Sequence, residues 1–163
     1  AELPSHVAVV RAMPNTPSLI GRGVTGIAPG ASAGEAEVDT VRRLFETVGS
    51  ALVVREDQIN AVAAVSGSGP AYLFLFAEEM TAAARRLGFD EDQATLLAQG
   101  TIAGAAELMA QSDKDPAELR RNVTSPKGTT EQAIFVLQDA GWGDLFDRAL
   151  AANVRRSEEL AGE

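Results

Sequence analysis

Cysteine is absent from this 163-residue chain, and histidine occurs once, at His6. The absence of cysteine excludes disulfide bonds, a thiolate nucleophile and cysteine-ligated metal sites. A single histidine also excludes a metal site built from a histidine cluster. The sequence shows no paired carboxylates and no Ser/His/Asp set that would indicate hydrolysis. We therefore expect no metal site and no hydrolytic chemistry.

Positive charge is scarce as well, with 14 Lys and Arg against 23 Asp and Glu, for a formal net charge of -9. This balance argues against nucleic acid and anionic membranes as partners. No uninterrupted apolar run approaches the roughly 20 residues of a membrane span, and the first residues lack the pattern of a signal peptide. We expect a cytoplasmic protein with one domain or two small ones.

The first part of the chain, residues 1–55, alternates strand and helix signals. Apolar and β-branched residues predict strands over residues 6–13, 24–28 and 51–54. A helix is expected to begin at Ser32 and to end at Gly49. Strand, helix and strand with short links form a βαβ unit, so parallel pairing is expected.

The second part, residues 56–163, has helical periodicity and no strand signal. Its expected helices have start or stop signals at Pro70, Gly88, Asp90, Asp115 and Thr129, and a last helix covers residues 142–160. The long middle helices are rich in small residues, which let helices approach closely. This composition indicates intertwined packing, including packing with a second subunit.

The predicted sheet has too little cover. Three strands and one helix cannot bury both faces of a parallel sheet, which is normally buried on both sides. A bare sheet would favour aggregation. We therefore expect the chain to be the C-terminal piece of a longer protein, with an α/β remnant followed by an all-helical part.

Three glycine- or proline-containing segments need separate interpretation. Gly21-x-Gly23-x-x-Gly26 has the spacing of a dinucleotide fingerprint but precedes a strand instead of following one, so we interpret it as a turn. Residues 66–70, Ser-Gly-Ser-Gly-Pro, indicate either a close-packed helix junction or a ligand-facing turn. Residues 13–17, Met-Pro-Asn-Thr-Pro, follow a strand and form either a cofactor contact or a simple Asx turn.

The loop at residues 123–132 is the most informative segment. It is polar, contains Pro126 and Gly128, and continues directly into an apolar helical pattern. A helix N-terminus leaves backbone N–H groups unpaired, and with the helix dipole these groups favour a small anion. The hydroxyls of Thr129 and Thr130 lie at the same place. The loop therefore indicates carboxylate recognition by main chain, although a capped helix start without a ligand has the same pattern.

Together these segments resemble pyrroline-5-carboxylate reductase, the last enzyme of proline synthesis. The resemblance rests on three motifs in order: residues 9–17 (VVRAMPNTP), 64–72 (AVSGSGPAY) and 122–130 (NVTSPKGTT). It implies a Rossmann domain for NADP or NAD, of which residues 1–55 are the end of the parallel sheet. It further implies that residues 56–163 form an all-α dimerisation domain, in a dimer or larger oligomer. The main cofactor motif would lie in the missing N-terminal part. Lys127 departs from the glycine of many members.

The resemblance also implies residue roles in the reduction of 1-pyrroline-5-carboxylate to L-proline. Backbone around Ser125, Gly128 and Thr129 would hold the substrate carboxylate, and Glu56 would approach the substrate. Thr130 would hydrogen-bond the ring nitrogen as the catalytic residue. The residues expected near the cofactor are Met13, Asn15, Thr16 and Asn122.

Two other functions remain open. A hydroxyacid dehydrogenase of similar plan would use a lysine on the interdomain helix, and the first lysine here is Lys114. A non-catalytic helical dimerisation module is the second alternative. The isolated chain is expected to be inactive as a reductase.

Overall fold

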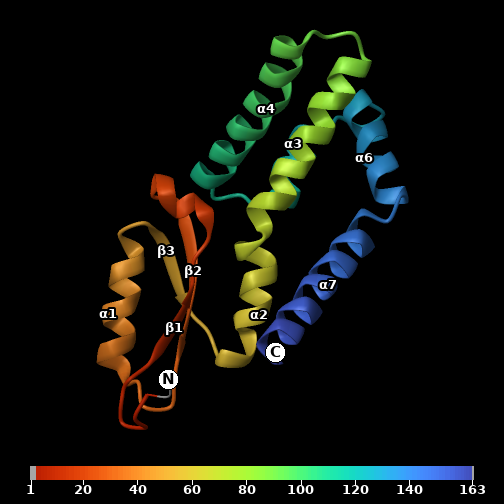
Figure 1. Cartoon of the computed structure of the whole chain (residues 1–163). Coiled ribbons are helices and arrows are strands. Elements are labelled where there is room, and N and C mark those ends of the chain that lie inside the picture. The colour runs from red at the N-terminus through yellow and green to blue at the C-terminus, as the bar shows by residue number, and fades with distance from the viewer. Residues whose placement is uncertain (1–2, 163) are drawn as a thin grey trace. The chain divides into compact units, whose positions relative to one another are not determined.

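The computed structural model describes residues 3–162. It contains two compact units: one joins the residues up to Tyr72 with those from Asp147 onward, and the other is Leu73–Phe146. The first unit holds a three-stranded sheet in the order β1-β2-β3, with β1 at Val10–Met13, β2 at Gly23–Pro29 and β3 at Gly49–Val53. Helix α1, Glu35–Glu46, connects β2 to β3 (Figure 1).

The pairing of the strands makes the sheet mixed. β2 and β3 are parallel, in register from Gly23 opposite Gly49 to Ile27 opposite Val53, which confirms the predicted βαβ unit. β1 is antiparallel to β2, with Met13 opposite Gly26, so the parallel interpretation of the first strand is wrong for this pair. The link between β1 and β2 holds only the short 3-10 helix η1, Thr16–Ile20, whereas a parallel crossover needs a dozen or more residues.

The N-cap of helix α1 lies two residues later than predicted. Its N-cap is Gly34, whose N–H donates to Oε2 of Glu37 at 2.9 Å. The hydroxyl of Ser32 instead donates to the carbonyl of Ser5 at 2.6 Å. The expected cap at Ser32 is wrong because the chain becomes helical only after Gly34, which leaves Ser32 outside the first turn.

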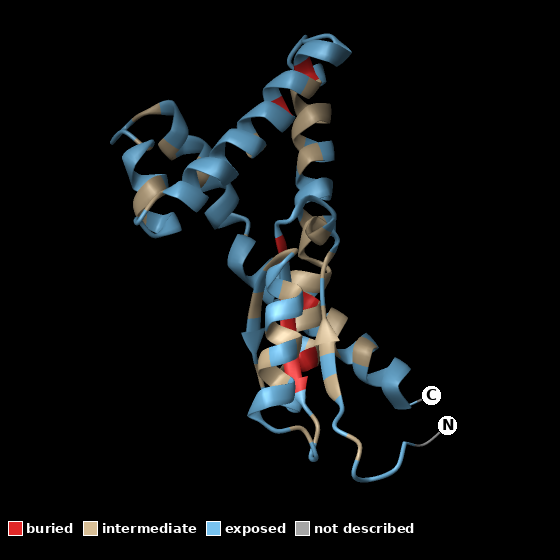
Figure 2. Cartoon of the chain, turned by 90° about the vertical axis from the view of Figure 1, so that its left-hand side faces the viewer, coloured by how far each residue is buried: buried red, intermediate tan, exposed pale blue. Residues whose placement is uncertain are grey.

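The core of the first unit lies around β2. Ile27 and Ala28 are fully buried, and Ile59 on helix α2, Ile59–Val62, is 1% exposed. The packing is close, since a Cβ added at Gly26 would lie 2.7 Å from Cγ1 of Val62. Figure 1 shows α1 and α2 on opposite sides of the sheet, and Figure 2 shows the buried residues gathered between them.

A nearly continuous helical stretch follows β3. It consists of the 3-10 helix η2 at Glu56–Gln58, then α2, the π-helical turn η3 at Ala63–Gly67, and α3 at Gly69–Arg86. Among the described residues, this stretch is long and apolar enough to cross a membrane by length and composition alone. One such helix is weak evidence, because the core helix of a soluble protein passes the same test. The expectation of no membrane partner stays a prediction.

The remaining helices are α4 at Glu91–Gln111, α5 at Pro116–Asn122, α6 at Thr129–Asp139 and α7 at Trp142–Gly162. Two predicted caps are confirmed: Asp90 Oδ1 accepts from the Gln93 N–H at 2.9 Å, and Asp115 Oδ1 accepts from the Glu118 N–H at 2.7 Å. The predicted cap at Thr129 is wrong, because Gly128 is the N-cap and Thr129 is already helical.

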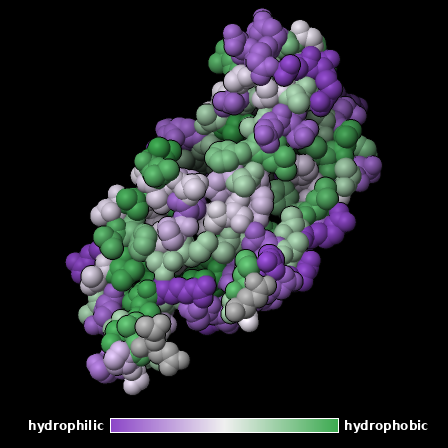
Figure 3. All heavy atoms as spheres, viewed as in Figure 1, coloured by the Kyte–Doolittle hydropathy of each residue, from purple (hydrophilic) through white to green (hydrophobic). Residues whose placement is uncertain are grey.

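The second unit leaves many large apolar side chains at its surface. Its fully buried hydrophobic residues, within the described part of the chain, are Ala94 and Ala98 on α4. By contrast, Phe74 is 63% exposed and Leu96 74% exposed. Figure 3 shows hydrophobic residues at the surface of the face in view. Contiguous exposed apolar surface of this kind marks an interaction site.

Candidate functional site

The predicted carboxylate loop lies between α5 and α6 and is held by its own backbone. The N–H of Gly128 donates to the carbonyl of Ser125 at 2.9 Å, which closes a tight turn. A Cβ on Gly128 would lie 2.9 Å from that carbonyl oxygen, so the turn requires glycine there. Lys127 has a φ of 60°, in the left-handed region that favours glycine. The departure at Lys127 therefore falls on a backbone position to which glycine is better suited.

The turn presents free donors at the start of α6. Among the described residues, the amides of Thr129 and Thr130 donate to no protein acceptor, and neither hydroxyl has a hydrogen-bond partner. Both residues are exposed. These are the unpaired first-turn groups of an 11-residue helix, and they lie at the positive end of its dipole.

Two of the neighbouring groups are already committed. The Gly128 amide donates within the turn, and the Lys127 amide donates to Oε2 of Glu131 at 2.8 Å. The Glu131 carboxylate brings negative charge to the first turn and occupies one donor. An incoming carboxylate would therefore use the amides of Thr129 and Thr130, with the Glu131 charge acting against it.

In the sheet unit, the predicted cofactor residue Asn15 uses both ends of its side-chain amide inside the protein. Its Oδ1 accepts from the Val24 N–H at 2.8 Å, and its Nδ2 donates to the Ser66 carbonyl at 3.0 Å. Met13 lies against Gly67, where an added Cβ would be 2.8 Å from the Met13 Cε. Asn15 therefore ties the loop after β1 to the rest of its unit.

The other predicted residues have simpler surroundings. Glu56 pairs with Arg11 at 2.5 Å between Oε1 and Nη1, and both side chains are more than half exposed. Sequence reasoning misses this partner because 45 residues separate the two. Thr16 begins η1, and Asn122 is the exposed last residue of α5.

The predicted site residues fall into two groups. Met13, Asn15, Thr16 and Glu56 belong to the sheet unit, whereas the second unit carries Asn122, Ser125, Gly128, Thr129 and Thr130. Each group thus lies within a single unit. In the described chain, no group of three or more His, Asp or Glu side chains is gathered as a metal site requires.

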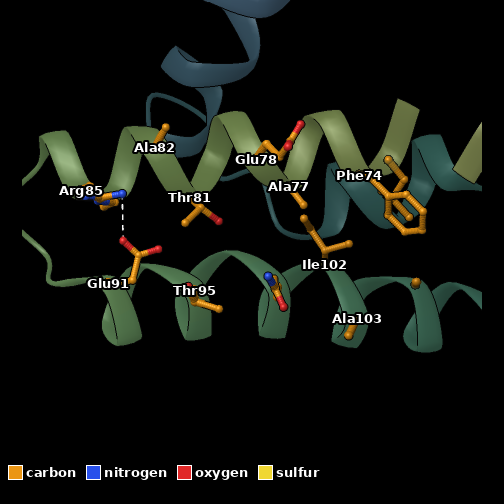
Figure 4. A pocket seen from close by; sticks show the side chains of 13 residues that line it. Phe74, Ala77, Glu78, Thr81, Ala82, Arg85, Glu91, Thr95, Ile102 and Ala103 are labelled. Carbon is orange, nitrogen blue, oxygen red and sulfur yellow. Dashed lines mark ion pairs between the residues drawn. The ribbon is translucent and has the colours of Figure 1, made fainter. Parts of the chain in front are cut away.

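A groove of about 720 Å³ runs along α3 and α4, and its lining includes no residue of the predicted loop (Figure 4). Its lining is mainly apolar and includes Phe74, Ala77 and Ile102. The Arg85–Glu91 ion pair, 2.8 Å long, lies at one end. Polar residues also line the groove, namely Glu78, Thr81, Thr95 and Gln99 beside the paired Arg85 and Glu91. The larger apolar share of the lining is suited to helix packing.

Comparison with known proteins gives consistent matches. Residues 56–160 match the family model described as pyrroline-5-carboxylate reductase dimerisation. The pyrroline-5-carboxylate reductase of Pseudomonas aeruginosa is 47% identical over 154 residues, which cover 94% of this chain and 56% of that protein. That of Corynebacterium melassecola is 45% identical, over 93% of this chain and 56% of that protein.

Solved structures agree with the fold. A pyrroline-5-carboxylate reductase from Coxiella burnetii superposes with a TM-score of 0.91 at 42% identity, covering 96% of this chain and 58% of that one. The Plasmodium falciparum pyrroline carboxylate reductase, solved with NADP bound, gives a TM-score of 0.85 at 28% identity, covering 95% and 62%. The chain spans less than two thirds of each of these relatives. The mixed sheet, the helical region and the family match over residues 56–160 lead to one conclusion: this chain belongs to the pyrroline-5-carboxylate reductase family.

Proposed function

We propose that this chain serves the NAD(P)H-dependent reduction of 1-pyrroline-5-carboxylate to L-proline in the cytoplasm, as a homodimer. Membership of the family supports the reaction class. The observation that carries the site is the first turn of α6, where Thr129 and Thr130 offer unpaired amides and hydroxyls. A domain boundary at residues 55/56 is part of the proposal, and the start of the family match at residue 56 supports it.

The reaction needs no strong acid from the protein. The imine nitrogen of the substrate is basic and binds its own proton, and the resulting iminium carbon accepts a hydride. The protein contributes orientation, which this chain supplies without cysteine or a histidine pair. The backbone at Ser125 and Thr129, together with the Thr130 amide, would hold the substrate carboxylate, and the compact Gly128 would leave room for it. The Thr130 hydroxyl would accept the hydrogen bond from the protonated ring nitrogen. Glu56 is assigned to the substrate by the family resemblance alone.

The residues assigned to the cofactor would lie beside its nicotinamide ring without holding its phosphates. Met13 presents an apolar surface, Thr16 a hydroxyl and Asn122 an exposed amide, whereas the Asn15 amide is already bonded on both sides. When bound, a nicotinamide supplies the hydride. The glycine motif at residues 21–26 does not hold the pyrophosphate, because it leads into β2 instead of a helix.

The test replaces Thr130 in the longest natural form of the enzyme that contains this chain. Thr130→Ala should lower kcat/KM for the substrate by about 10–100-fold, roughly 1.4–2.7 kcal/mol. Thr130→Ser keeps the hydroxyl and is the matched control, so it should retain most of the activity. Equal activity of the Ala and Ser variants would remove the hydroxyl from the mechanism.

A non-catalytic dimerisation module is the second candidate, because the matched family model describes dimerisation. Light scattering and calorimetry with proline and NADP distinguish the two. A dimer that binds neither compound favours the module. The hydroxyacid dehydrogenase alternative has less support, since the three ordered motifs and the relatives compared above belong with the reductase family, and the first lysine is Lys114.

A further inference from the structure

The π-helical turn η3, Ala63–Gly67, ends inside the Ser-Gly-Ser-Gly-Pro motif of residues 66–70. Its first three residues precede the motif, and its last two, Ser66 and Gly67, belong to it. Its defining bond runs from the Ser68 N–H to the Ala63 carbonyl at 2.8 Å, a spacing of five residues. Such turns insert one residue into a helix, disturb the regular carbonyl pairing and occur often at functional sites. The proposed reaction assigns no role to this turn.

Side chains from three segments satisfy the groups that the turn exposes. The Tyr72 hydroxyl donates to the Ala64 carbonyl at 3.1 Å, and the Asn15 Nδ2 donates to the Ser66 carbonyl at 3.0 Å. Asn153 on α7 donates to the Ser68 hydroxyl at 2.8 Å. The turn is therefore fixed by polar side chains that come from far apart in the sequence, all within the sheet unit.

Asn15 differs from the other two because it bridges. It lies 51 residues before Ser66 and, through Oδ1, also accepts from the Val24 N–H of β2 at 2.8 Å. One half-buried amide thus joins the strand and the turn, because its nitrogen and its oxygen each hold one hydrogen bond within the protein. The close approach of Met13 to Gly67 adds an apolar contact at the same junction.

We propose that Asn15 is a positioning residue that fixes the π-helical turn to β2, and that the first part of the glycine motif, residues 66–68, is a packed junction rather than a ligand-facing turn. Asn15 then affects catalysis through the turn and the first residues of α3, without touching the cofactor. The kinetic part of this statement rests on the proposed reductase function, whereas the structural part does not.

The experiment is residue-resolved amide exchange on the 163-residue chain. Asn15→Asp preserves the acceptor for the Val24 N–H but removes the donor to the Ser66 carbonyl. Exchange of the Ser68 amide should rise about tenfold, as expected for the loss of one hydrogen bond, while Val24 stays close to wild type. Thr16→Ala, in the same loop, is the matched control and should change neither amide. Unchanged exchange at Ser68, or an equal rise at all amides of the unit, would overturn the proposal.

A second measurement needs no variant and holds if Asn15→Asp fails to fold. In the wild-type chain, the side-chain NH₂ of Asn15 should exchange more slowly than that of the exposed Asn122, which has no side-chain hydrogen bond among the described residues. Equal rates would contradict the bridge.

Steady-state kinetics complete the test, measured on the longest natural form of the enzyme that contains this chain. Asn15→Asp should lower kcat while KM for NADPH stays within about twofold, a difference of less than about 0.4 kcal/mol. A raised KM for NADPH together with unchanged Ser68 exchange would make Asn15 a cofactor ligand and overturn the assignment. A wild-type enzyme without reductase activity would refute the proposed function and leave the exchange result standing.

Discussion

Gly49 opens β3 at a position where the backbone permits no side chain. Its φ is 152°, and a Cβ added there would lie 2.0 Å from the carbonyl oxygen of Gly23 and 2.4 Å from its nitrogen. Both are main-chain atoms of β2, which pairs with β3 at this point. The Gly23 N–H also donates to the Val48 carbonyl at 2.9 Å. Relief of the clash must therefore separate the two strands.

Gly49→Ala should destabilise the chain by about 2–6 kcal/mol. An unfavourable backbone conformation costs about 1–3 kcal/mol, and a forced shift of packed groups costs a further amount of about 1–3 kcal/mol. For a chain of this size each kcal/mol lowers Tm by about 2–4 °C, so we expect a decrease of at least about 4 °C.

Thermal unfolding followed by far-UV circular dichroism measures the effect. Gly143→Ala in α7 is the control, because a Cβ there meets nothing within 4 Å. Alanine is also favoured over glycine in helices by about 1 kcal/mol, so this variant should keep or raise Tm. If the Gly49→Ala protein has the same Tm as the Gly143→Ala protein, the steric argument is refuted.

Three other predictions concern the helices. Asp90→Ala removes the N-cap of α4 and should lower the free energy of unfolding by about 1 kcal/mol, measured by urea denaturation. The hydrogen bond from Arg42 lowers the pKa of the Asp39 carboxyl on α1. The stability that ionised Asp39 contributes is therefore present above the unfolded-state pKa and is lost as pH falls through the lower folded-state pKa. The difference in urea midpoint between wild type and Asp39→Asn should accordingly disappear in strong acid. Phe74→Glu should weaken the proposed homodimer at least about tenfold in sedimentation experiments, because a charge enters the apolar α3 face. Leu19→Glu, on η1, is the control and should leave self-association unchanged.

The elements that sequence reasoning places correctly are those with local causes. The helix stops at Gly88 and Gly141 follow from positive φ values of 102° and 72°, which glycine adopts readily. The cap at Asp90 depends on the residue three positions later. Such signals lie within one turn of chain and can be read without the tertiary structure.

The features that sequence reasoning places wrongly or misses depend on distant partners. Ser32 is not the N-cap of α1, and its hydroxyl donates instead to the carbonyl of Ser5, 27 residues away, a partner that no local signal indicates. The bridge from Asn15 to Ser66 spans 51 residues, and no periodicity indicates it. At the candidate site, the motif order identifies the loop, but the use of the Gly128 amide within the turn is visible only in the folded chain.

The small buried core of the second unit has a consequence for how the molecule acquires its stability. Alanines supply the fully buried apolar residues there, within the described chain, while side chains such as Leu96 and Val136 face outward. If a second copy covers them, folding of this unit is bimolecular, and its melting temperature rises with protein concentration. A newly made chain would then be most vulnerable to proteases and aggregation in the interval before it associates with a second copy.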